Sequence, residues 1–440
     1  MRDYFYELSD FLTAGLTGDE VFTASFSGEE SDFTRFNQAK VRQSGHVSQR
    51  YLSVDLIDGR RHAAGTVTLT GEGDEDRARL TDLVGQLRRL IPNLPEDPHL
   101  LISEEVKSTE QSRESRIPAG GDAVEQILNA GEGHDLVGIF ATGDITAGFA
   151  NSLGQRNWFS TSSYNFDYSL YHHGDKAVKS AYAGFEWSED DLRAKIASSA
   201  EHLPVLGREA KTIEPGKYRV YLSPVALYDF VGMVGWGGYG LKSHRTKQTV
   251  LLRMIEEGAT LADAVTISEN TRDGVAPNFS EKGFIKPDVV TMIENGAFKD
   301  CLVSPRSAKE YDVPTNGAGA WEAPESLDIA AGNIPQAEAL GRLDTGVLIN
   351  NVWYLNYSDR PACRITGMTR FACFWVESGK VVAPLNVMRF DETIYRALGE
   401  NLIGLTAERE MILDSGTYGG RATSSGRVPG ALVENFNFNL

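Results

Sequence analysis

The sequence contains few cysteines, and this excludes a small fold held together by disulfides. Only three cysteines occur among 440 residues, at positions 301, 363 and 373. A disulfide framework requires a denser and more regular set of cysteines than this. Cys363 and Cys373 could form a pair, but reduced and buried thiols are the favoured interpretation.

Long apolar runs are absent as well. No stretch approaches 18 consecutive apolar residues, so we expect no membrane-spanning helix and no membrane partner. Residues 1–12 carry acidic side chains and lack the apolar core of a secretion signal. A cytoplasmic protein is therefore expected.

Positive charge is also scarce. The chain has 61 acidic against 43 basic residues, giving a formal net charge of −18 at pH 7. The closest approach to a basic cluster is a pair of neighbouring arginines, such as Arg60 and Arg61. Because a negative field repels phosphate backbones, we expect no nucleic-acid partner.

The common catalytic motifs are missing. There is no His-Glu-x-x-His pair of zinc ligands, and none of the eight histidines lies four or five residues from another. There is no Gly-x-Ser-x-Gly elbow, and neither Cys363 nor Cys373 has an identifiable histidine partner. The residues by themselves therefore predict a folded protein with no assembled catalytic set.

Periodicity and turn signals predict an α+β protein. We expect an N-terminal mixed α/β domain over residues 1–212, followed by a domain over 213–440 that is dominated by antiparallel β-sheet. The expected helices cover residues 3–16, 75–91, 123–130 and 190–200. The expected strands cover residues 50–57, 62–70, 136–141, 147–152, 158–171, 217–222 and 432–440, with a loop over 103–121.

Three stretches carry a resemblance to a known family. These are residues 35–43, residues 146–158 and residues 369–380, the last of which reads TRFACFWVESGK. In this order they resemble segments of the TldD/TldE (PmbA) peptidase family. The last stretch is similar to the run S-R-G-A-x-G-F-W-V-E-N-G of TldE/PmbA, so the resemblance favours that non-catalytic type.

The resemblance also implies what has happened to the metal site. In the catalytic type, zinc is held by His-Glu-x-x-x-His and by a distant cysteine in a Gly-Thr-Cys-Gly segment. Here the matching positions are Tyr228 for the first histidine, Asp229 for the glutamate and Met233 for the second histidine. Tyr418 stands where the cysteine would be.

These substitutions predict that the chain binds no metal or other cofactor. Neutral phenols and a thioether are poor zinc ligands, and one carboxylate does not make a site. Tyr228, Met233 and Tyr418 are then expected to fill the former metal pocket. A groove for an extended peptide is expected nearby, at Trp236, Gly237, Tyr239 and Arg370.

The resemblance implies a non-catalytic subunit that pairs with a TldD-like zinc peptidase. The pair would form a chamber for proteolysis or maturation of small unfolded peptides, with the zinc in the partner. Two alternatives remain. One is a self-sufficient metallohydrolase with a divergent site, using Asp229, His244 or Cys373. The other is a homodimer that binds peptides without a peptidase partner.

Overall fold

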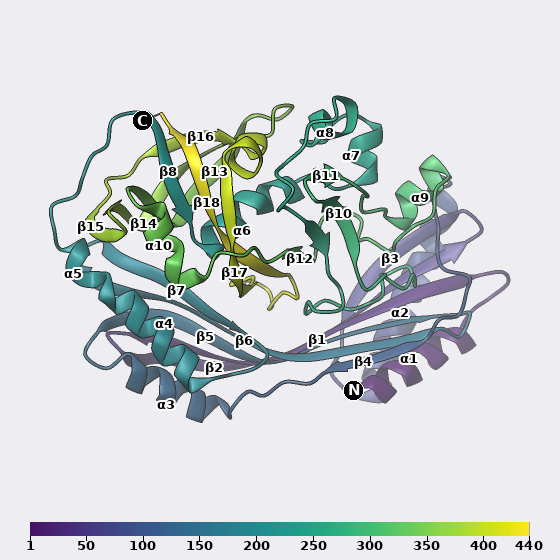
Figure 1. The fold of residues 1–440 in the computed structure, drawn as a ribbon. Coiled ribbons are helices and arrows are strands. Elements are labelled where there is room, and N and C mark those ends of the chain that lie inside the picture. The colour runs from purple at the N-terminus through teal and green to yellow at the C-terminus, as the bar shows by residue number, and fades with distance from the viewer. Residues whose placement is uncertain (440) are drawn as a thin grey trace.

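The computed structural model describes residues 1–439, which form two β-sheets lying one above the other (Figure 1). Within these residues the first sheet has seven strands between Val21 and Gly184, and the second has eleven between Gly216 and Phe438. The predicted α+β fold with an antiparallel C-terminal sheet is confirmed. The chain completes one sheet before it begins the other, while the domain boundary at residue 212 stays a prediction.

The first sheet is antiparallel except for one short edge strand. Its order is β3-β2-β1-β5-β6-β4, and β7 also pairs with β6. The predicted hairpin is present, with Gly59 at the turn in a left-handed conformation of φ +60°. The strands are β1 (Val21–Asn37), β2 (Lys40–Asp58), β3 (Arg61–Thr68), β4 (Thr109–Arg113), β5 (Asp135–Asn151), β6 (Arg156–His173) and β7 (Lys176–Gly184).

Two expectations for the first sheet are wrong. The segments 136–141 and 147–152 belong to one continuous strand, β5, rather than to two. Gly143 lies inside it with φ +142°, and a Cβ there would lie 2.1 Å from the carbonyl oxygen of Glu30. The glycine thus permits a close approach of neighbouring strands and marks no turn. The expected loop 103–121 contains the polar strand β4, which only its pairing with β6 reveals.

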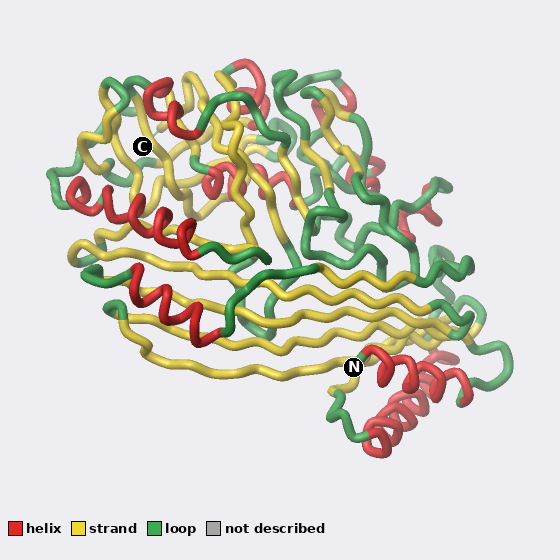
Figure 2. The backbone as a smooth tube through the Cα atoms, turned by 60° about the horizontal axis from the view of Figure 1, so that its bottom comes forward, coloured by secondary structure: helices red, strands yellow, loops and turns green. Residues whose placement is uncertain are grey.

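Helices cover the face of the first sheet that points away from the second sheet (Figures 1 and 2). One apolar core joins α1 and α2 to the sheet through fully buried Phe5 and Leu80, and another joins α3 and α4 through Ile127 and Ile196. Burying each such side chain contributes about 1.5–3 kcal/mol. The helices are α1 (Arg2–Ala14), α2 (Gly73–Leu90), α3 (Gly120–Ala130) and α4 (Glu189–Glu201). The short α5 (Leu203–Leu206) instead packs Val205 and Leu206 against strands of the second sheet.

The second sheet runs in the order β11-β10-β9-β12-β18-β16-β14-β13-β8. Strand β8 also pairs with β18, so the pairings close a ring. The strands are β8 (Gly216–Leu222), β9 (Ile267–Glu269), β10 (Val290–Glu294), β11 (Ala297–Phe298), β12 (Ser326–Ile329), β13 (Gly346–Asp359), β14 (Arg364–Glu377), β15 (Lys380–Pro384), β16 (Arg389–Thr393), β17 (Leu402–Leu413) and β18 (Ser425–Phe438).

The largest apolar core lies beneath this sheet and includes one face of helix α6. The expected last strand is present as β18, although Leu440 lies outside the described residues. None of the helices in residues 1–439 has the length and apolar character needed to cross a membrane. The helices of this half are α6 (Pro224–Gly232), α7 (Leu241–Arg245), α8 (Leu252–Glu256), α9 (Pro305–Tyr311) and α10 (Ala339–Leu343).

Candidate functional site

Helix α6 carries the first residues of the predicted site. Its start is encoded locally, because Ser223 caps the helix and Pro224 occupies the first turn. The Ser223 hydroxyl accepts a hydrogen bond from the Ala226 N–H (3.2 Å) and donates one to the Asn350 carbonyl oxygen (2.7 Å). These bonds fix the helix against β13, and with it the direction of Tyr228 and Asp229.

Tyr228 packs its ring against the backbone of β18. A Cβ added at Gly426 would lie 2.4 Å from that ring, so the glycine makes room for the tyrosine. Burial raises the pKa of Tyr228 to about 12, and the nearby negative charges of Asp414 and Asp229 act in the same direction. The side chain is therefore a neutral phenol at neutral pH.

Asp229 follows on the same helix and is mostly removed from water. Burial raises the pKa of its carboxyl group to about 6, while the positive charge of Lys179 acts in the opposite direction. A carboxyl group with this pKa exchanges its proton close to neutrality, which is unusual for aspartate. Asp229 belongs to helix α6 in the second half of the chain and Lys179 to β7 of the first sheet, so only the fold relates them.

Met233 and Tyr418 do not face each other across a pocket. Met233 is 4% exposed and belongs to the main apolar core, whereas Tyr418 is 104% exposed on the loop after β17. The expectation that Tyr418 fills a former metal pocket is therefore wrong, because its side chain packs against nothing in the described chain. Tyr228 and Met233 are packed side chains, and that they fill a former metal pocket stays a prediction.

The donor set does not fit zinc. Tyr228 offers a neutral phenol, Met233 points a thioether into the core and Tyr418 faces solvent. Across residues 1–439, no group of three or more His, Cys, Asp or Glu side chains is placed to hold a metal ion. His244 is instead hydrogen-bonded to the Gly238 carbonyl oxygen (2.7 Å).

Cysteine chemistry has no support here either. All three cysteines are free, and Cys363 and Cys373 are buried. Burial raises the pKa of the Cys363 thiol to about 12 and also raises that of Cys373. Thiols held in the protonated form are poor nucleophiles and poor metal ligands.

Two adjoining hollows meet at Lys179, on strand β7. The larger, of about 700 Å³, lies between the open face of the first sheet and the loop after β17. The smaller, of about 360 Å³, lies beside the start of α6. Both are rich in polar side chains from segments that are distant in the sequence. No local pattern marked these residues in the sequence.

Charged and polar side chains surround Lys179 where the two hollows meet. Lys179 Nζ lies 3.4 Å from Asp167 Oδ2 and 5.9 Å from the centre of the Phe371 ring. The Oδ1 atom of buried Asn351, in the smaller hollow, has no hydrogen-bond partner within residues 1–439. An N–H group of a bound peptide would satisfy it.

Of the residues predicted to line a groove, Trp236 and Arg370 are exposed and Tyr239 is buried. Trp236 is 62% exposed, and Gly237 follows it in a left-handed turn of φ +88°. Arg370 is exposed and lies 5.1 Å over the ring of Trp353. Tyr239 is only 1% exposed and belongs to the core, so the expectation that it lines a groove is corrected.

Solved structures share this fold along nearly the whole chain. TldE from Thermococcus kodakarensis aligns with a TM-score of 0.80 at 14% identity, covering 99% of this chain and 100% of that one. A protein from Thermotoga maritima MSB8, described as a candidate modulator of a DNA gyrase, aligns with a TM-score of 0.76 at 14% identity and 99% coverage of both chains. A protein from Bacteroides thetaiotaomicron VPI-5482 with a similar description gives 0.76 at 14% identity, covering 99% and 98%.

At this identity the alignments establish the fold, an α+β architecture of two facing sheets. The sequence itself matches the profile of the PmbA/TldA metallopeptidase C-terminal domain over residues 215–439. The chain therefore belongs to the PmbA/TldD family. No curated protein matches its sequence significantly.

Proposed function

We propose that this chain is a non-catalytic, TldE-like subunit that pairs with a TldD-like zinc peptidase. The partner would hold the zinc and the attacking water. This chain would complete a chamber in which small unfolded peptides are cleaved or matured. The location that fits this role is the cytoplasm.

One observation carries the proposal. The positions matching the family's zinc ligands hold a neutral phenol at Tyr228, a core thioether at Met233 and a solvent-facing phenol at Tyr418. None of these is a group that binds zinc tightly. A member of a metallopeptidase family with this donor set is best explained as a partner of a member that keeps the ligands.

The hollows around Lys179 support a role in holding peptide. The smaller hollow lies beside the start of α6 and offers the unpartnered Oδ1 of Asn351. Lys179, which lines both hollows, is near enough for its charge to act on Asp229. An extended peptide could therefore be bound and oriented by this chain while the reaction takes place on the partner.

Co-expression tests the pairing. The chain would be produced with a TldD-like protein that carries His-Glu-x-x-x-His, and the mixture separated by size-exclusion chromatography. We expect one heteromeric peak that cleaves unfolded peptides and contains zinc, and no cleavage by this chain alone. Cleavage by the isolated chain, with near-stoichiometric metal, would favour the self-sufficient metallohydrolase. A stable homodimer that does not bind the TldD-like protein would favour the alternative of a homodimer that binds peptides without a peptidase partner.

A further inference from the structure

A third hollow is separate from the site at α6, because no residue of α6 lines it. It has a volume of about 560 Å³, within the range of pockets that bind drug-sized ligands. One side comes from the β2–β3 hairpin and residues 97–101, and the other from residues 277–286, 304–306 and 318–325. It therefore lies where the first and second halves of the chain meet, a common place for ligand sites.

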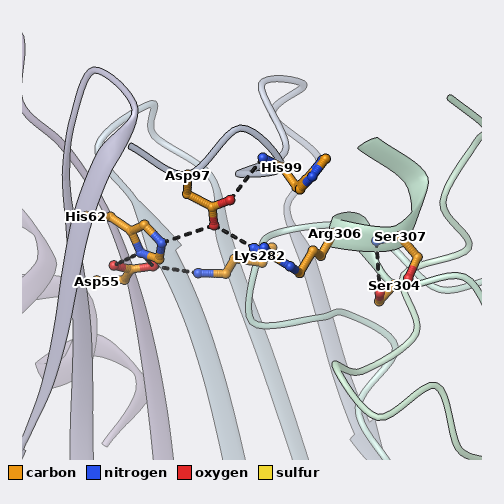
Figure 3. Close-up of polar contacts among 8 residues, drawn as sticks. All are labelled: Asp55, His62, Asp97, His99, Lys282, Ser304, Arg306 and Ser307. Carbon is orange, nitrogen blue, oxygen red and sulfur yellow. Dashed lines mark hydrogen bonds and ion pairs between the residues drawn. The ribbon is translucent and has the colours of Figure 1, made fainter. Parts of the chain in front are cut away.

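A chain of acidic side chains, two cations and the His62 ring crosses between the halves of the molecule at this pocket (Figure 3). The His62 ring lies between two carboxylates, with Nδ1 2.9 Å from Asp55 Oδ1 and Nε2 3.5 Å from Asp97 Oδ2. Lys282 Nζ lies 2.5 Å from Asp55 Oδ2, and Arg306 Nη1 lies 2.6 Å from Asp97 Oδ2. Each acidic group is thus already paired with a cation.

Arg306 keeps donors available for a ligand. Its bond to Asp97 is its only side-chain hydrogen bond within residues 1–439, so Nε and Nη2 are without partners there. The side chain is 56% exposed, so a ligand can reach it. The two lysines that line the pocket are paired: Lys282 with Asp55 (2.5 Å), and buried Lys286 with Glu325 (2.8 Å). Glu281 lies at the exposed rim. A guanidinium with two free donors is suited to a carboxylate.

Apolar side chains also line the pocket, and one of them is an unusually exposed tryptophan. Trp321 is 91% exposed, whereas Phe279 in the same pocket is 5% exposed. The remaining apolar side chains of the lining are Leu100, Leu101, Pro277, Pro305, Ala318 and Ala320. Exposing a whole indole to water is unfavourable, so an apolar group that covers it would gain free energy.

The backbone beside Trp321 is fixed in an uncommon conformation. Glu322 has φ +50°, which non-glycine residues rarely adopt. Its buried carboxylate holds this shape by accepting hydrogen bonds from the Ser304 N–H (2.9 Å), the Ser304 hydroxyl (2.9 Å) and the Lys242 N–H (2.9 Å). Strain of this kind, maintained by surrounding bonds, is typical of functional sites.

We infer that this pocket binds the carboxyl-terminal residue of a short peptide whose last side chain is apolar or aromatic. Arg306 pairs with the terminal carboxylate, and the last side chain packs between Phe279 and Trp321. The pocket shares no lining residue with the hollows around Lys179. The binding of a peptide end here requires neither zinc nor a partner chain.

Calorimetric titration of the full-length chain tests this inference. The probe is acetyl-Ala-Ala-Phe with a free carboxylate, compared with its carboxyl-terminal amide and with acetyl-Ala-Ala-Ala. We expect the free acid to bind at least about tenfold tighter than the amide, because only the free carboxylate can form a charge-assisted hydrogen bond with Arg306. The alanine peptide should also bind more weakly than the phenylalanine peptide.

Substitutions at Arg306 and Trp321 test whether these two residues cause the preference for the free acid and for the phenylalanine side chain. Arg306→Gln should remove the preference for acid over amide, and Arg306→Lys should keep part of it. Trp321→Ala should weaken binding of the phenylalanine peptide, whereas Trp353→Ala, at another exposed tryptophan, should not. Thermal unfolding checks that every variant is folded.

Two results would overturn the inference: equal affinity for acid and amide in the natural chain, or unchanged binding in Arg306→Gln. Either result would leave the proposed pairing with a peptidase untouched, because the titration uses this chain alone. Conversely, if the chain bound the free-acid peptide but did not pair with a TldD-like protein, the proposed function would fail and this inference would stand.

Discussion

Arg421, on the loop after β17, donates a hydrogen bond from Nη2 to the Oγ of Ser163 on β6, at 2.6 Å. The same guanidinium also donates to the carbonyl oxygens of Ser163 (2.8 Å) and Gly143 (3.2 Å). Desolvation lowers the pKa of Arg421 to about 10, although Glu29 and Asp144 act in the opposite direction. The side chain stays charged at neutral pH and fastens the Tyr418 loop to the first sheet.

Arg421→Ala should therefore destabilise the protein. The substitution removes several hydrogen bonds and leaves the acceptors on the sheet without their donor, so we expect the free energy of unfolding to fall by about 2–4 kcal/mol. Urea unfolding followed by circular dichroism measures this. Arg60→Ala, at an exposed arginine on the hairpin turn, is the matched control and should change little. Equal effects of both substitutions would contradict the anchoring role.

Met233 and Tyr418 should respond oppositely to truncation. Met233→Ala leaves a cavity in the main core and should cost about 2–5 kcal/mol. Tyr418→Ala removes an exposed side chain and should cost less than about 0.5 kcal/mol. Denaturant unfolding of the two variants compares them directly. A large loss for Tyr418→Ala would restore the idea that this tyrosine fills a pocket.

Asp229 should make stability depend on pH. Its pKa is raised to about 6 in the folded chain, above the ordinary value near 3.9. The folded state therefore holds the proton more tightly, and stability should decrease as the pH rises from about 4 to about 6. A shift of this size corresponds to roughly 2–3 kcal/mol.

Asp229→Asn removes the titration and should raise stability above pH 6 by about 1–3 kcal/mol, with a smaller effect at pH 4. Unfolding free energies measured at pH 4, 5, 6 and 7.5 test this. Asp19→Asn, at an exposed aspartate, serves as the control. A pH profile that is the same for Asp229→Asn and the natural chain would refute the raised pKa.

The three thiols should be reduced and slow to react in the folded chain. Burial raises the pKa of Cys301 to about 11, and of Cys363 to about 12. At pH 8 a thiol with a pKa near 11 has roughly a hundredfold less thiolate than an ordinary cysteine, so its reaction slows accordingly. Ellman's reagent should titrate three thiols after unfolding without reductant. Finding only one would indicate a disulfide between Cys363 and Cys373.

Much of the local structure was predictable because its causes are local. The strands expected over 50–57 and 62–70 follow from local alternation, and Gly59 supplies the left-handed turn between them. The wrong division of β5 into two strands, over 136–141 and 147–152, has a physical reason at Gly143. A glycine in a strand can mark a turn or a close approach of two backbones, and only the position of Glu30 distinguishes them.

The sequence alone determined that the zinc-ligand positions hold Tyr228, Asp229, Met233 and Tyr418, because side-chain chemistry is fixed by residue type. It could not determine that Tyr418 faces solvent, that Lys179 lies near Asp229, or that Arg306 and Trp321 line one pocket. Such relationships join residues from separate segments, and no periodicity or local signal encodes them. The two sheets bring these residues together when they pack, so their burial, their pKa values and their neighbours are properties of the tertiary structure.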